Sequence, residues 1–187
     1  MITDSDIRRP TGQIYDQENG IVKFEQTKKL DFELEMGTVI GGSLPIGETL
    51  DFEGAENLIF GYVLLNDWSA RDVQAWEYQP LGPFLSKSFG TSISPWIVSP
   101  EALEPFKTTP PERDFQLLPH FEDDKAFVFD IDLKVTLIEY GGTKTDIVET
   151  NAKELYYSPV QQIIHHASAG CGICLLYTSP SPRDVCS

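Results

Sequence analysis

The sequence predicts an α+β fold in which strands predominate. Two segments alternate apolar and polar residues, LDFELEMG at positions 30–37 and AFVFDIDLKVTLIEYGG at 126–142, and branched and aromatic residues fill positions 58–65. Alternation is typical of a strand with one buried face, whereas an unbroken apolar run is typical of a strand buried on both faces. Only positions 69–78 and 158–167 favour helices, so we expect helices to be the minor component.

Length and charge limit the classes of protein to which the chain can belong. Its 187 residues, 41% of them apolar, suffice for one substantial core, and we place a single domain at residues 1–173. The formal net charge of -15 opposes binding to nucleic acid or to anionic membranes. No stretch approaches the roughly 18 apolar residues of a membrane-spanning helix, and the start MITDSDIRRP lacks the features of a signal peptide. We therefore expect a cytoplasmic protein.

The C-terminal end differs in character from the rest. The three cysteines, Cys171, Cys174 and Cys186, offer no disulfide framework for the body of the chain, which fits a reducing compartment. Residues 174–187, CLLYTSPSPRDVCS, show no periodicity and do not continue the preceding pattern. We expect them to be foreign sequence, such as translated adapter or vector, and exclude them from the fold.

The predicted domain begins irregularly and continues with a strand. Turn-forming residues are frequent between positions 8 and 20, where no periodicity is sustained, so we expect an irregular segment there. Positions 30–37 then form a strand. Its apolar face is Leu30, Phe32, Leu34 and Met36, and its opposite face is Asp31, Glu33 and Glu35.

The buried strand at 58–65 should lead directly into a helix. Ser69 is the expected N-cap, and Asp72, three residues later, is the acid of a capping box. The polar helix should end near Tyr78, because the next residues include Pro80, Gly82 and Pro83.

The remaining sequence alternates loops with one strand and one helix. Gly, Ser and Pro among positions 82–100 indicate tight loops with short strands, and 107–124 is a second loop-rich stretch. The strand at 126–142 should end in a hairpin at its two terminal glycines. The final helix is predicted at 158–167 from the spacing of Val160, Ile163, Ile164 and Ala167.

Two glutamates on the first strand are candidate metal ligands. Glu33 and Glu35 are two residues apart, so both side chains leave the same face of a strand within about 7 Å of each other. The solvated face of a half-buried strand has the same pattern, and that alternative stays open. Because Ca²⁺ usually takes about 6 to 8 oxygen ligands, a metal site requires a third acid. Asp67, directly after the buried strand, is the candidate.

A polar stripe follows from Asp67 onward. Arg71, Gln74 and Tyr78 come at spacings of four, three and four residues, which place them on one side of a helix. Charge, amide and phenol together suit an anionic, oxygen-rich substrate. A plain solvent-exposed face with an Asp67–Arg71 ion pair fits the spacing equally well.

Five segments resemble the fumarylacetoacetate hydrolase family. The longest is NDWSARDVQAWEYQPLGPFLSKSFGTSISPW at 66–96, and the others are RRPTGQ, LDFELEMG, FDIDLKV and YYSPVQQIIHHASAGC. Together they extend from Arg8 to Cys171. The resemblance implies the family's mixed β-sandwich roll, incomplete here, and a natural protein more than twice as long. It also implies a homodimer.

The resemblance implies a role for each candidate residue. Glu33, Glu35 and Asp67 match the acids that hold Ca²⁺, and Lys87 and Thr91 match the segment beside a Mg²⁺. A lysine ammonium has no lone pair, so Lys87 can contribute only its backbone carbonyl or lie near the ion. Arg71, Gln74 and Lys87 match residues around the attacked carbonyl, and Gln74 and Tyr78 match substrate contacts.

The implied activity is cleavage of the carbon–carbon bond of 4-fumarylacetoacetate, a diketo acid, into fumarate and acetoacetate in tyrosine and phenylalanine breakdown. The family's base histidine lies upstream of RRPTGQ, its partner glutamate lies near the C-terminus, and neither matches this chain. His120, His165 and His166 are not assigned to catalysis, so we expect these 187 residues alone to be inactive. Alternatives are a related hydrolase or decarboxylase of acylpyruvates or ring-cleavage products, or a chain that only binds cations. WEYQPLGPF favours the first assignment.

Overall fold

The computed structural model describes residues 1–174, so all but the first residue of the expected foreign tail lies outside the described residues. Two compact units make up the described chain. Unit 1 comprises Met1–Gly37 and Val63–Trp96, and unit 2 comprises Thr38–Tyr62 and the residues from Ile97 onward. Strands β4 (Leu34–Ile40) and β5 (Ile59–Asp67) run through the boundary, so each unit contains part of both.

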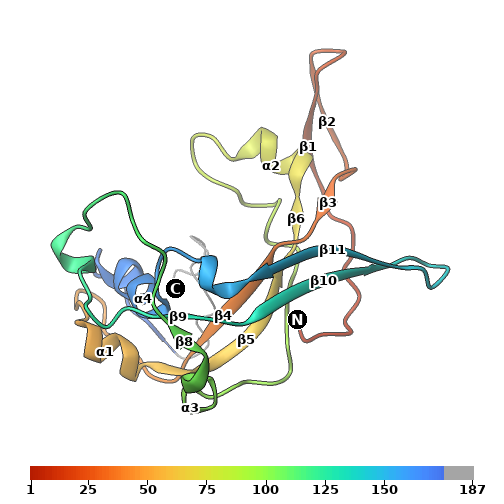
Figure 1. Ribbon diagram of the computed structural model, residues 1–187. Coiled ribbons are helices and arrows are strands. Elements are labelled where there is room, and N and C mark those ends of the chain that lie inside the picture. Colours follow the sequence, from red (N-terminus) through yellow and green to blue (C-terminus); the bar gives the residue numbers. More distant parts are fainter. Residues whose placement is uncertain (175–187) are drawn as a thin grey trace. The chain divides into compact units, whose positions relative to one another are not determined.

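Short antiparallel pairings build unit 1 (Figure 1). Strands β1 (Thr11–Asp16) and β2 (Ile21–Gln26) form a hairpin, and β3 (Leu30–Asp31) pairs with β6 (Ser69–Ala70). In the three-stranded sheet of order β4-β5-β7, β5 pairs antiparallel with β7 (Thr91–Ile93). Helix α2 spans Arg71–Glu77. The strand pairings bring the ends of β3, β4, β5 and β7 together with the start of α2.

The hairpin at 11–26 corrects the expectation of an irregular segment at 8–20. The Asp16 carboxylate accepts hydrogen bonds from the backbone N–H groups of Glu18 and Asn19, which closes the turn, and Gly20 has a φ of +65°. The Tyr15 ring stacks on Trp76 of α2 with ring centroids 5.7 Å apart. Because this packing partner is far along the chain, local periodicity did not indicate the strands.

The predicted strand at 30–37 is interrupted. It divides into β3 and the start of β4, with Phe32 and Glu33 between them. The Glu33 N–H donates to Oδ1 of Asn66 at 3.0 Å rather than to a neighbouring strand. Both predicted faces of Phe32–Met36 are half-buried, so the alternation does not separate a core face from a solvent face.

The start of α2 also differs from the expectation. The helix begins at Arg71 after Ala70, which provides no side-chain cap, and Ser69 lies buried in β6. Asp72 is not part of a capping box, because its carboxylate accepts hydrogen bonds from the Thr27 hydroxyl and, at 2.8 Å, from the Lys28 N–H. Asp67 belongs to β5, so the predicted helical stripe keeps only Arg71 and Gln74 within the helix.

Unit 2 contains helices, 3-10 helices and two antiparallel strand pairs. In chain order they are α1 (Phe52–Asn57), α3 (Pro100–Leu103), the 3-10 helix η1 (Glu104–Phe106), β8 (Lys107–Thr108), η2 (Pro119–Phe121), β9 (Val128–Phe129), β10 (Asp132–Ile138), β11 (Lys144–Asn151), η3 (Ala152–Glu154) and α4 (Pro159–Ala167). Strands β8 and β9 pair antiparallel, as do β10 and β11. Unit 2 thus contains the second predicted loop-rich stretch, 107–124, and the final helix, whereas most of the first stretch, 82–100, lies in unit 1.

Helix α4 confirms the prediction at 158–167. The Ser158 hydroxyl accepts from the Gln161 N–H, and the Gln161 side chain accepts from the Ser158 N–H, which completes a capping box. The four apolar residues chosen from their spacing are all buried: Val160, Ile163, Ile164 and Ala167. Burial of one face therefore holds this helix in unit 2.

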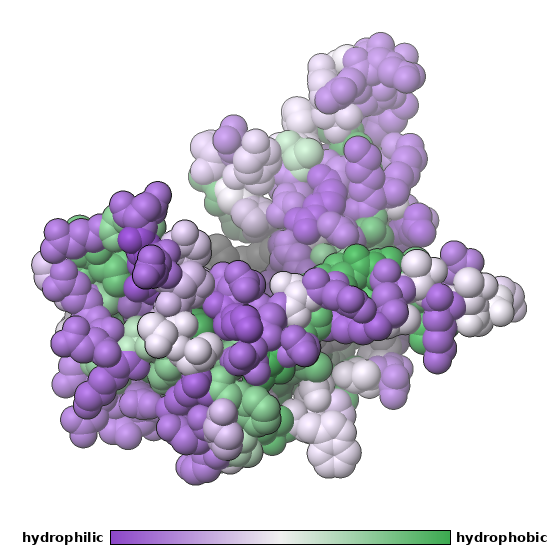
Figure 2. All heavy atoms as spheres, in the orientation of Figure 1, coloured by the Kyte–Doolittle hydropathy of each residue, from purple (hydrophilic) through white to green (hydrophobic). Residues whose placement is uncertain are grey.

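The other two strand predictions are correct in part. The hairpin at Gly141 and Gly142 is present between β10 and β11, but residues 130–131 separate β9 from β10. Side chains such as Ile138, 60% exposed, lie at the surface, and Figure 2 shows apolar residues over this hairpin. In β5, Phe60 and Leu64 are exposed, so the strand is not buried on both faces as predicted. Among residues 1–174, no helix has the length and apolarity needed to cross a bilayer.

Candidate metal centre

Three carboxylates from two segments of the sequence meet in unit 1. One oxygen from each of Glu33, Glu35 and Asp67 lies within 4.8 Å of the other two. Glu33 precedes β4, Glu35 is on β4, and Asp67 ends β5. The Asp67 N–H donates to the Glu33 carbonyl oxygen at 3.2 Å, so a backbone hydrogen bond holds the two segments in register. The expected third acid is therefore present beside the first two.

Two cationic side chains contact this carboxylate cluster. The Lys87 ammonium donates to the Glu33 carboxylate and lies 3.1 Å from Oδ2 of Asp67, and its side chain is only 10% exposed. Arg71 Nη1 lies 2.9 Å from Oε1 of Glu33, and Arg71 Nε donates to Oδ2 of Asp31 at 2.7 Å. Each cation therefore bridges two acids and is held in a defined position.

The electrostatics of the cluster are unbalanced towards negative charge. Burial, followed by the charges of Asp67 and Glu33, raises the pKa of Glu35 to about 7. Burial works in the same direction on Glu33, but the hydrogen bonds and charges of Lys87 and Arg71 outweigh it and lower the pKa of Glu33. The two cations thus stabilise Glu33 as a carboxylate, while Glu35 keeps its proton up to about pH 7.

The residues fit a hard divalent cation. Asp31, Glu33, Glu35 and Asp67 face Arg71 and Lys87, which leaves two negative charges when all six groups are ionised. Carboxylate oxygens are the ligands that Ca²⁺ and Mg²⁺ prefer. A bound cation would offset the repulsion from Asp67 and Glu33 that, after burial, contributes to the raised pKa of Glu35. The Lys87 ammonium is a hydrogen-bond donor to the acids, so it is not itself a ligand.

The other predicted site residues differ in their relation to the cluster. The Thr91 hydroxyl donates to Oδ1 of Asp67 at 3.3 Å, and Oε1 of Gln74 accepts from Arg71 Nη1 at 3.0 Å. Tyr78 follows the last residue of α2 and is 49% exposed. None of the hydrogen bonds or ion pairs found around the cluster within residues 1–174 involves the Tyr78 side chain. The structure thus brings all predicted site residues except Tyr78 into one network.

Sequence reasoning missed two acids that support this network. Asp31 binds Arg71, and its alternation with Glu33 and Glu35 on the predicted carboxylate face was the signal that could have identified it. Glu77, at the end of α2, accepts hydrogen bonds from the segment before Lys87. Its partners lie seven to nine residues along the chain in a loop, so no periodicity indicates the contact.

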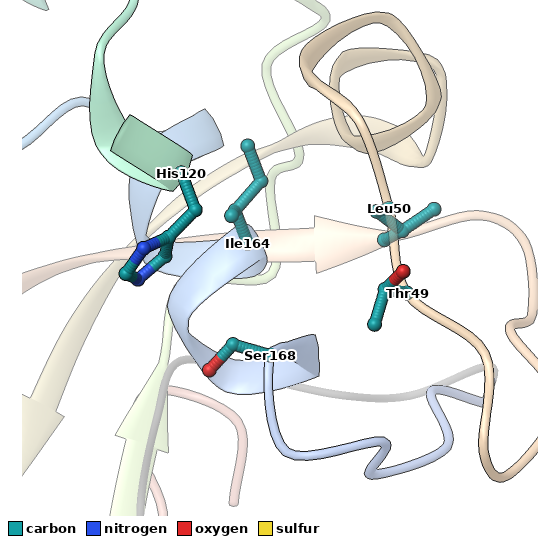
Figure 3. Close-up of a pocket in the computed structure, with 5 residues that line it drawn as sticks. All are labelled: Thr49, Leu50, His120, Ile164 and Ser168. Atoms are coloured by element: carbon teal, nitrogen blue, oxygen red, sulfur yellow. The ribbon is translucent and has the colours of Figure 1, made fainter. Parts of the chain in front are cut away.

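Unit 2 contains a separate surface depression of about 460 Å³. Thr49, Leu50, His120 of η2, Ile164 of α4 and Ser168 line it, as Figure 3 shows. These five residues include no carboxylate, so the lining does not suit a hard cation. The carboxylate cluster of unit 1 therefore remains the candidate metal centre.

Comparison with known proteins identifies relatives of the chain. A family model described as fumarylacetoacetate (FAA) hydrolase C-terminal matches residues 1–176. Fumarylacetoacetase of Arabidopsis thaliana is 47% identical over 174 residues, which is 92% of this chain and 41% of the relative. The enzyme named fumarylacetoacetase in Homo sapiens is 42% identical over 174 residues, 92% of this chain and 42% of that protein. The chain therefore spans about two fifths of the length of these curated relatives.

Solved structures share the fold. Cg1458 superimposes with a TM-score of 0.53 at 17% identity, covering 91% of this chain and 63% of that one. A Burkholderia cenocepacia protein, provisionally assigned as a fumarylpyruvate hydrolase, gives a TM-score of 0.53 at 15% identity, covering 96% of this chain and 81% of that one. These matches confirm the α+β, strand-rich fold class. The chain thus belongs to the fumarylacetoacetate hydrolase family, and residues 1–176 correspond to the family's C-terminal part.

Proposed function

We propose that the protein containing this chain hydrolyses 4-fumarylacetoacetate to fumarate and acetoacetate. The observation that carries the proposal is the carboxylate cluster of Glu33, Glu35 and Asp67 with Lys87 and Arg71 at its edge. Relatives named fumarylacetoacetase, 41–47% identical across the chain, support the choice of substrate. The same family favours a cytoplasmic homodimer.

We further propose which ions the cluster holds. The oxygen-only donor set of Glu33, Glu35 and Asp67 supports Ca²⁺. A Mg²⁺ beside Asp67 is supported by Thr91, whose hydroxyl contacts the Asp67 carboxylate, and by the backbone next to Lys87. When bound, such a cation supplies a Lewis acid that favours the enolate form of a diketone.

The reaction requires stabilisation of an oxyanion and of a departing enolate. Water adds to the fumaryl carbonyl carbon, and the bond to the adjacent methylene then breaks with its electron pair leaving as the acetoacetate enolate, which gains a proton. The addition creates an oxyanion, and fixed donors stabilise such a charge by a few kcal/mol in a site that excludes water. Arg71 and Lys87 are cationic donors already held in place by acids.

Gln74 has a distinct part in this proposal. Its Oε1 accepts a hydrogen bond from Arg71, so its amide group is oriented with the –NH₂ directed elsewhere. That –NH₂ can donate to a substrate oxygen. Tyr78, at the exposed end of α2, is proposed as a substrate contact from the family resemblance. None of the chain's three histidines, all in unit 2, matches the family's base, so we expect hydrolysis only from the longer protein.

The test is an assay of the longer protein with a substrate panel. We expect fumarylacetoacetate to be consumed, with fumarate and acetoacetate formed in equal amounts, and acylpyruvates to react at least tenfold more slowly. Glu33→Gln and Asp67→Asn should abolish turnover. Glu48→Gln is the matched control, because Glu48 is exposed and lies in unit 2. Preference for an acylpyruvate would overturn the substrate assignment, and unchanged turnover in both cluster variants would overturn the site.

A further inference from the structure

A single carboxylate organises the loop that leads to Lys87. Oε1 of Glu77 accepts hydrogen bonds from the N–H groups of Phe84 at 2.7 Å and Ser86 at 2.8 Å, and from the Ser86 hydroxyl at 2.6 Å. Oε2 accepts from the Leu85 N–H at 3.2 Å. Three consecutive backbone N–H groups therefore converge on one side chain, in the manner of an anion-binding nest.

The loop of residues 84–88, which we name the Lys87 loop, is anchored at further points. The N–H groups of Lys87 and Ser88 both donate to the Phe84 carbonyl oxygen, at 3.1 and 2.9 Å. The Ser86 carbonyl oxygen accepts from the Ala70 N–H at 2.9 Å, and Ser86 is fully buried. Lys87 follows Ser86 directly, and its ammonium reaches Glu33 and Asp67.

We propose that Glu77 is a positioning residue that holds the Lys87 loop so that the Lys87 ammonium is delivered to the carboxylate cluster. That this positioning matters for catalysis rests on the proposed function. The positioning itself rests only on the hydrogen bonds of Glu77. The hydrogen bonds of the Glu77 carboxylate described above all go to this loop, so its side chain acts on the chemistry through Lys87.

The position of Glu77 is not explained by the helix that carries it. Glu77 is the last residue of α2, where a negative charge faces the negative end of the helix dipole and is unfavourable. Burial would also raise the pKa of Glu77, but the hydrogen bonds from Ser86, Phe84 and Leu85 outweigh it and lower that pKa. The ionised side chain is therefore stabilised by the loop rather than by its own helix.

The geometry defines an informative substitution. In Glu77→Gln, the retained Oε1 can still accept from Phe84 and Ser86, but an –NH₂ replaces Oε2 and faces the Leu85 N–H, so two donors meet. The side chain keeps its size and the helix remains. A second variant, Ser86→Ala, removes only the hydroxyl donor at the other end of the same contact. Glu48→Gln again matches the change in charge.

The experiment measures Lys87 directly in the longer protein, without substrate. Reductive methylation followed by peptide mass spectrometry reports how accessible the Lys87 amine is, and hydrogen exchange reports the amides of 84–86. We expect Glu77→Gln to methylate Lys87 about tenfold faster than wild type, which corresponds to about 1.4 kcal/mol, and to exchange those amides faster. Glu48→Gln should leave both rates unchanged. Where Glu77→Gln does not fold, Ser86→Ala should give a change in the same direction of about threefold.

Kinetics separate positioning from simple structural support. If the proposed function holds, Glu77→Gln should lower kcat about tenfold with less effect on KM, while its circular dichroism spectrum and Tm stay near those of Glu48→Gln. If Lys87 is methylated no faster in the folded variants than in wild type, the proposal is overturned. If wild type does not turn over fumarylacetoacetate, the proposed function fails, and the methylation and exchange rates still decide the role of Glu77.

Discussion

Asp31 and Arg71 form an ion pair at the edge of the candidate centre, with Arg71 Nε 2.7 Å from Oδ2 of Asp31. The same guanidinium contacts Glu33 and Gln74 through Nη1. The hydrogen bond from Arg71 is the largest influence on the pKa of Asp31 and lowers it. Asp31 therefore holds one side of the guanidinium while the other side faces the cluster, which makes the orientation of Arg71 depend on an acid outside the cluster.

Replacing Asp31 should impair catalysis by releasing Arg71. Asp31→Asn retains an oxygen acceptor but loses the charge, so we expect kcat/KM of the longer protein to fall about five- to tenfold, a loss of about 1 to 1.4 kcal/mol. Asp6→Asn, an exposed position in the same unit, is the control for charge. Steady-state kinetics measure this change. An unchanged kcat/KM in Asp31→Asn would show that Arg71 keeps its orientation without the Asp31 carboxylate.

Removal of the two strand glutamates should abolish cation binding. Titration calorimetry of Ca²⁺ into the protein should show saturable binding in wild type and in Glu48→Gln, but none in the Glu33→Gln, Glu35→Gln double variant, because only one acid of the cluster remains. Equal binding by the double variant and wild type would mean that these two glutamates are an ordinary solvated strand face.

Cation affinity should fall as the pH falls below 7. The pKa of Glu35 is raised to about 7, so a proton competes with the cation for this carboxylate. Between pH 8 and pH 6 the ionised fraction falls about tenfold, and we expect the Ca²⁺ affinity to fall by about the same factor. Calorimetry at the two pH values measures this change, and Glu35→Gln should show a weaker affinity with little dependence on pH.

The metal-free protein should show the opposite trend in stability. The pKa of Glu35 is 4.5 in its ordinary state and about 7 in the folded protein. Between these two pH values, folded Glu35 retains a proton that the unfolded chain has lost. The free energy of unfolding should therefore fall as the pH rises through this window, by about 1 to 2 kcal/mol once solvent screening is allowed for. Urea unfolding in chelator at pH 5 and pH 7.5 measures the difference, and Glu35→Gln should reduce it.

Gly12 should not accept a larger side chain. A Cβ at this position would lie 2.7 Å from Cγ1 and 2.9 Å from Cγ2 of Val73 on α2. We expect Gly12→Ala to reduce the free energy of unfolding by about 1 to 3 kcal/mol. Gly141→Ala is the control, because no atom lies within 4 Å of its added Cβ. Denaturant unfolding measures the cost, and a Val73→Ala background should reduce it.

Local sequence patterns predicted those features whose contacts are local. The period of two placed Glu33 and Glu35 on one side of the chain, and the structure confirms that their carboxylates meet. The capped and amphipathic segment at 158–167 forms a helix with the expected buried residues, and the two glycines at 141 and 142 form the expected hairpin turn. In each case the determining residues lie within a few positions of one another.

Only the tertiary structure decided which distant segments join the site. Asp67 meets Glu33 through a backbone hydrogen bond across 34 positions, and Lys87 reaches both acids from a loop held by Glu77. The β1–β2 hairpin stacks Tyr15 on Trp76 of α2. The strand break at Phe32 and Glu33 likewise follows from a side-chain partner on β5. Periodicity in a sequence sets the direction in which side chains leave the backbone, but the partners they meet are set by the packing of segments that are far apart in the chain.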